Sequence, residues 1–63
     1  MFKAMEQLEN GEFTGFILEA ENEKEIISQI SNSYSEKTEW YVINEITKEE
    51  FIYNSDKNIL EKI

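Results

Sequence analysis

Hydrophobic positions between Phe13 and Ala20 recur at every second residue, which is typical of a β-strand with one covered face. Phe16, Leu18 and Ala20 share that face. The preceding Asn10-Gly11 favours a two-residue type I′ turn, because both residues tolerate positive φ. The pattern therefore predicts that this segment is the second strand of a hairpin.

The first strand of the predicted hairpin runs from about Phe2 to Glu9, so that Met5 faces Phe16. An alternative is a short helix over Lys3 to Glu9, whose residues are good helix formers, ended by Gly11. The strand is preferred, since it agrees with the strong turn signal after it.

After Ala20 the apolar residues recur at every third or fourth position instead of every second, which predicts a helix from Glu23 to about Ser33. Asn22 with Glu25 three residues later is typical of a helix N-cap, and acidic residues stabilise the positive end of the helix dipole. The apolar stripe of this helix comprises Ile26, Ile27, Ile30 and, at its end, Tyr34.

Glu39 to Ile46 is the strongest strand in the chain, because it is rich in aromatic and β-branched residues. Trp40, Val42 and Ile46 are expected on one face, with Tyr41 on the other. Both faces are therefore partly apolar. One can pack on the helix, and the other needs cover from the C-terminal segment or from another chain.

Two short helices are predicted after this strand. Thr47 with Glu50 resembles a capping box, which indicates a helix from Lys48 to Tyr53. Asn54 and the polar residues after it break that helix, and a last one covers Lys57 to Ile63. The predicted fold is α+β: a small single-layer antiparallel sheet packed against one or two helices, in the approximate order β-β-α-β-α.

Length and composition limit what this chain can do. Its 63 residues make a single domain, 1–63, which buries a modest core. It contains no cysteine and no histidine, so disulfides and the usual zinc sites are excluded. No base stands beside a nucleophile, and the two glycines form no phosphate-binding loop. We expect no catalytic residues, no metal site and no cofactor.

Charge is the strongest indication of function. Fourteen acidic residues oppose six lysines, a net charge of −8 with no arginine. Direct binding to nucleic acid or to an anionic membrane is disfavoured, and a basic protein partner is favoured. No signal peptide or membrane-spanning stretch is visible, so we expect a cytoplasmic protein. Half of the acids precede residue 26, and the predicted partner-binding acidic face comprises Glu9, Glu12, Glu19, Glu21, Glu23 and Glu25.

Two hypotheses for function agree with these features, both without catalysis. In the first, the acidic face imitates the phosphates of DNA, and the protein inhibits or regulates a basic protein that handles nucleic acid. Small phage and mobile-element inhibitors of the anti-restriction, anti-CRISPR or antitoxin type are similar in size and charge. In the second, the chain is a structural module that forms a homodimer through an apolar sheet face, with Phe13, Ile17 and Tyr41 as its candidate contacts.

Overall fold

A five-stranded antiparallel sheet and one helix account for the chain in the computed structural model, which describes residues 1–63. The strands lie in the order β2-β1-β3-β4-β5, so the two segments flanking the helix in sequence, β2 and β3, are separated by β1. The elements in chain order are β1 (Phe2–Leu8), β2 (Phe13–Ala20), α1 (Glu23–Ser33), β3 (Thr38–Asn44), β4 (Glu50–Asn54) and β5 (Ile59–Lys62).

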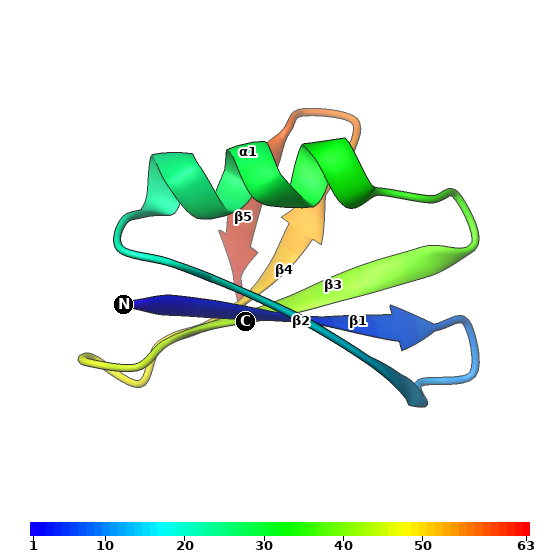
Figure 1. Ribbon diagram of the computed structural model, residues 1–63, viewed down its shortest axis with the longest axis horizontal. Helices are drawn as coiled ribbons and strands as arrows, with labels where there is room; N and C mark the ends of the chain where they lie inside the picture. The colour runs from blue at the N-terminus through cyan, green and yellow to red at the C-terminus, as the bar shows by residue number, and fades with distance from the viewer.

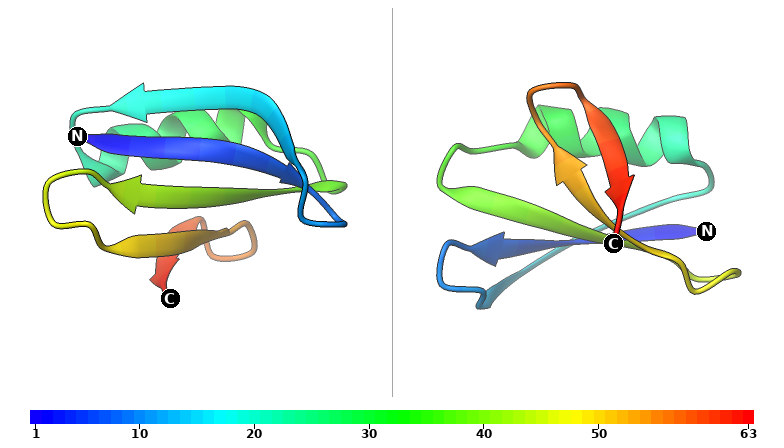
Figure 2. Two further views of the ribbon diagram at one scale, coloured as in Figure 1. Left: turned by 90° about the horizontal axis from the view of Figure 1, so that it is seen from below. Right: turned by 180° about the vertical axis from the view of Figure 1, so that it is seen from behind.

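The helix lies across one face of the sheet, and nothing lies across the other (Figure 1). Viewed from the opposite side, all five strands are visible with α1 behind them (Figure 2, left). The α+β class is therefore confirmed. The predicted order β-β-α-β-α is wrong, because the segment after β3 adds two strands to the sheet instead of covering it with helices.

The core lies between α1 and the covered face of the sheet. Ile26 and Ile30 of the helix contribute fully buried side chains, as their spacing predicts. Trp40 is also fully buried, and the ring of Phe16 packs edge-on against it with the ring centroids 5.5 Å apart. The buried residues are Ala4, Ala20, Ile26, Ile30, Trp40, Val42 and Tyr53.

The first hairpin forms, so the N-terminal segment is a strand and the helical alternative is wrong. Its turn differs from the prediction. Gly11 N–H donates to the carbonyl of Leu8, and within this turn only Gly11 has a positive φ, at 87°. This geometry is a three-residue loop, a β-turn followed by a left-handed glycine. With a bulge farther along the hairpin, it places Met5 opposite Ile17 and not opposite Phe16.

The helix begins and ends at the predicted residues, Glu23 and Ser33. The side chain of Asn22 accepts a hydrogen bond from the backbone N–H of Glu25 at 2.9 Å, as expected of an N-cap. Local sequence signals determine α1, because the N-cap and the apolar stripe predict a helix over the same residues.

The helix predicted over Lys48 to Tyr53 is wrong, and β4 occupies most of that segment. Asn44 closes the loop before it: its side-chain oxygen accepts from the N–H groups of Ile46 and Thr47, while its own N–H donates to Glu49. Lys48 has a φ of 67°, which no helix accommodates. Ile46, placed on the strand in the prediction, lies in this loop and is 81% exposed.

The helix predicted over Lys57 to Ile63 is also wrong, since β5 pairs antiparallel with β4. Asn54 ends β4 and accepts hydrogen bonds from the backbone of Asp56 and Lys57, so the expected breaker is the start of a hairpin turn. Phe51 and Leu60 then pack against the core. Pairing with a neighbouring strand outweighs the weak helical preference of such short segments.

Shortening a core side chain of α1 is expected to weaken the fold in proportion to its burial. Ile30→Val removes one buried methylene and should lower the free energy of unfolding by about 1 kcal/mol. Urea denaturation followed by the fluorescence of Trp40 measures the change. Ile46→Val, the same substitution at an exposed loop position, is the control and should leave stability unchanged; equal losses in both variants would contradict the assigned core.

Candidate protein-binding surface

The face of the sheet opposite α1 is named the open face. Trp40 and Val42 of β3 are buried beneath the helix, so the alternate residues of this strand point to the open face. Tyr41 lies opposite Met5 on one side and opposite Ile52 on the other, and Met5 lies opposite Ile17. This row of four apolar side chains crosses four strands at the centre of the face.

Further apolar residues extend the row. Phe13 lies opposite Gln7, and Ile43 follows Tyr41 by two residues on β3, so it is on the same face. The exposed fractions are 57% for Phe13 and 46% for Ile17, which is unusual for large apolar side chains so close together. The apolar members of the open face are Met5, Phe13, Ile17, Tyr41, Ile43, Ile52 and Ile59.

All three residues of the predicted apolar interface, Phe13, Ile17 and Tyr41, lie on the open face. Ile52 and Ile59 are missing from the predicted interface, because the sequence pattern predicts helices for the segments that carry them. The run of aromatic and β-branched residues Phe51, Ile52 and Tyr53 between two polar turns was the signal that could have identified β4 as a strand.

Carboxylates surround this apolar centre. The registers place four acidic residues on the open face and a single lysine, Lys3, opposite Glu19. None of the four carboxylates belongs to an ion pair, since the only ion pair of the protein joins Lys62 to Glu49 at 2.8 Å. The open face is therefore net acidic, and its acids are Glu19, Glu39, Glu50 and Glu61.

Tyr41 joins the apolar centre to the acidic surroundings. Its hydroxyl donates a hydrogen bond to the carboxylate of Glu50 on the adjacent strand. This hydrogen bond, followed by burial of the ring and the charge of Glu50, raises the pKa of Tyr41 to about 12. The phenol therefore stays protonated well into the alkaline range, and its hydrogen bond holds Glu50 beside the apolar row.

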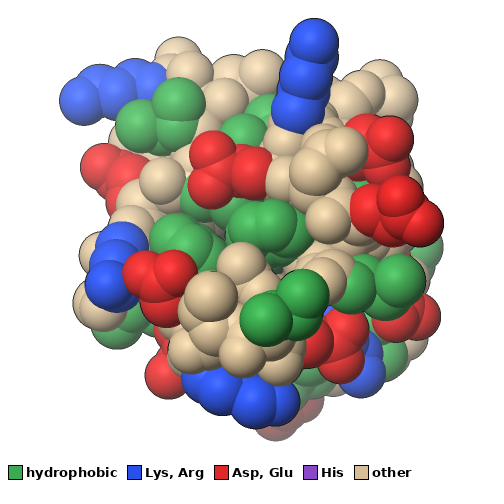
Figure 3. Space-filling view, turned by 90° about the vertical axis from the view of Figure 1, so that its left-hand side faces the viewer, with side chains coloured by type: hydrophobic (Ala, Val, Ile, Leu, Met, Phe, Trp, Pro, Cys, Tyr) green, Lys and Arg blue, Asp and Glu red, His purple; other side chains and the backbone are tan.

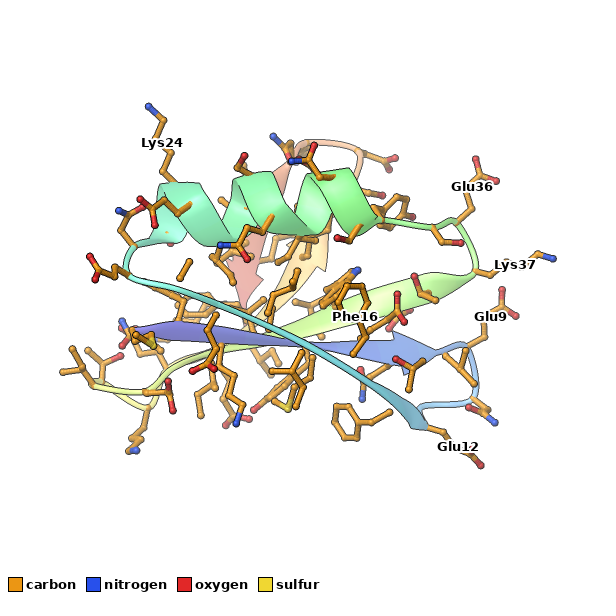
Figure 4. The ribbon with its side chains drawn as sticks, viewed as in Figure 1. Glu9, Glu12, Phe16, Lys24, Glu36 and Lys37 are labelled. Atoms are coloured by element: carbon orange, nitrogen blue, oxygen red, sulfur yellow. The ribbon has the colours of Figure 1, made fainter.

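The structure divides the six predicted acidic residues among three places. Glu9 and Glu12 lie at the turn between β1 and β2, at one end of the molecule (Figure 4). Glu21, Glu23 and Glu25 lie beyond the other end of β2, a strand whose eight residues span roughly 25 Å. Glu19 lies on the open face. No single surface brings all six together.

Even at the end that carries the start of α1, carboxylates do not form a continuous patch. Figure 3 shows acidic side chains there interspersed with lysines and with apolar groups. Lys24 projects from the same end of the helix (Figure 4). A duplex carries an unbroken series of phosphates, and this end of the molecule has no comparable series.

No group of three acidic side chains converges in an arrangement that could hold a metal ion. The only helix has 11 residues and is too short to cross a membrane. The open face brings apolar side chains together with carboxylates, and this combination suits the binding of a protein.

No protein-family model, curated protein or solved structure matches this chain. The strand registers and side-chain contacts of the open face are therefore the basis on which its function is inferred.

Removing the charge of Glu50 should lower the pKa of Tyr41. In Glu50→Gln we expect the Tyr41 phenol to titrate closer to its ordinary value of about 10. Because the pKa is raised in the folded state, the stability linked to Tyr41 is present below pH 10 and is lost as the pH rises toward about 12. NMR titration of the tyrosine rings measures the shift.

Glu39→Gln is the matched control for this titration, since Glu39 lies on the open face and has no hydrogen bond to Tyr41. An unchanged Tyr41 titration in Glu50→Gln, or an equal shift in both variants, would contradict the assigned contact.

Proposed function

We propose that this protein works without catalysis, by binding a basic protein through the open face. The observation that carries the proposal is a row of apolar side chains, Ile17, Met5, Tyr41 and Ile52, that crosses four strands with no helix or strand packed over it (Figure 1). Burying such a row against a partner supplies binding free energy, and the carboxylates around it supply orientation and rapid association.

The charge of the open face favours a basic partner over a second copy of this chain. Two copies packed face to face would bring eight carboxylates together against two lysines, since each face carries four acids and Lys3 alone. Juxtaposed like charges oppose association. A partner whose apolar patch is surrounded by lysine and arginine avoids this repulsion and pairs with the unpaired acids instead.

Among basic proteins, those that handle nucleic acids carry extensive positive surfaces. We propose that the partner belongs to this class and that the protein acts in the cytoplasm as its inhibitor or regulator. The net charge of −8 supports this proposal. The support comes from the acids surrounding the apolar row, rather than from an unbroken imitation of a duplex, because Glu9 and Glu12 lie far from Glu21 and Glu23.

A charge placed in the apolar row should abolish partner binding while the fold survives. Ile17→Lys alters a side chain that is 46% exposed, so little core packing is lost. Wild type and variant serve as baits in affinity capture from the source cell's lysate, and mass spectrometry identifies the bound proteins. We expect a basic protein that is retained by the wild type and lost with the variant.

Ile46→Lys is the control, since it makes the same substitution at an exposed residue of the β3–β4 loop and should still capture the partner. Sedimentation analysis of the pure protein should give a monomer at low and high salt. In sedimentation, a dimer that dissociates in Ile17→Lys would overturn the proposal in favour of self-association. In affinity capture, a protein retained equally by both variants would show that the open face is not its binding site.

A further inference from the structure

A polar cleft of about 510 Å³ lies on the helix side of the molecule, away from the open face. The β4–β5 loop rises beside the C-terminal half of α1 (Figure 1), and the cleft lies between this loop and the end of the helix. Tyr34, directly after α1, accepts a hydrogen bond from Ser55 of the loop at 3.1 Å. The lining residues are Ser31, Tyr34, Glu36, Tyr53, Ser55, Asp56 and Asn58.

Three of the four hydroxyl groups of this cleft already donate a hydrogen bond within the protein, and only the hydroxyl of Tyr34 keeps its proton. Ser31 donates to the carbonyl of Ser28 at 2.9 Å, and Ser55 donates to Tyr34. Tyr53 donates to the side-chain oxygen of Asn58 at 2.5 Å. Each hydroxyl has one proton and two lone pairs, so these three groups offer only lone pairs to a ligand. The cleft therefore suits a ligand that is rich in donors.

The electrostatic surroundings of the cleft favour positive charge. Glu36 and Asp56 line it, and neither forms an ion pair. The last turn of α1 contains no basic residue, so the negative end of the helix dipole is uncompensated beside the cleft. No lysine lines the cleft.

Two tyrosine rings add a further feature that favours a cation. The rings of Tyr34 and Tyr53 lie with their centroids 6.0 Å apart and their planes inclined at 58°. Tyr53 is buried, so the ring of Tyr34, which is 37% exposed, is the one whose face can attract an ammonium or guanidinium group. Burial, followed by the effect of Tyr34, raises the pKa of Tyr53, and the hydroxyl of Tyr53 donates its proton to Asn58.

We infer that this cleft binds the cationic end of a lysine or arginine side chain of a protein partner. These groups carry only donors, as the acceptors of the cleft require, and their charge is complementary to Glu36 and Asp56. The inference goes beyond the proposed function, because the cleft lies on the helix side and can be occupied whether or not the open face binds a partner.

The test uses acetyl-arginine methylamide as the probe, with the full-length protein labelled for NMR. We expect saturable shifts of the backbone amides of Ser31, Tyr34, Ser55 and Asp56, with a dissociation constant on the order of 1–10 mM. Acetyl-citrulline methylamide has nearly the same shape without the charge and should give no saturable shift. Shifts spread over all acidic regions, or equal binding of the uncharged probe, would overturn the inference.

A pair of matched double variants shows where the probe binds. Glu36→Gln with Asp56→Asn should weaken binding at least about fivefold. Glu21→Gln with Glu45→Gln removes the same charge away from the cleft and should leave the affinity unchanged. Equal weakening in the two double variants would show that only the net charge of the protein matters, and would overturn the inference. The dispersion of the amide spectrum shows whether both variants are folded.

Spermidine distinguishes a side chain from a free polyamine, because both carry alkylammonium groups. We expect spermidine, per ammonium group, to bind no more tightly than acetyl-lysine methylamide. Tighter binding per group would assign the cleft to a free polyamine and overturn the inference of a partner's side chain.

Discussion

One helix can cover only one face of a sheet, and this constraint shapes the whole protein. The chain has a single helix of 11 residues, and its C-terminal third forms two more strands, β4 and β5. The helix buries Ile26 and Ile30 in one cluster with Trp40 and Val42, which gives a small apolar core. Every side chain on the other face of the five strands is left without cover.

The unequal faces explain why apolar residues remain exposed in so acidic a chain. A strand cannot place Trp40 in the core without directing Tyr41 and Glu39 to the opposite side. Solubility then depends on the carboxylates that surround the apolar row, of which Glu50 is held in place by Tyr41. The same arrangement is suitable for recognition, since it combines an apolar centre with charged surroundings.

The cleft beside Tyr34 arises from a different consequence of the same topology. Because β4 and β5 form a hairpin at one end of the sheet, their turn reaches the end of α1, and Ser55 hydrogen bonds to Tyr34. The end of a helix exposes unpaired carbonyl groups, and no basic side chain of this helix neutralises them. The acceptor-rich cleft and the apolar open face thus lie on opposite sides of the sheet.

The sequence by itself determined the elements whose signals are local: the N-cap at Asn22, the length of α1, and the alternation that buries Trp40 and directs Tyr41 to the opposite face. It also placed Phe13, Ile17 and Tyr41 together as an apolar group. Only the tertiary structure decided that β4 and β5 join the sheet, because strands of five and four residues are stabilised by pairing, β4 with β3 and β5 with β4. It also decided that Glu9 and Glu25 lie at opposite ends, since an extended strand separates residues by more than about 3 Å each.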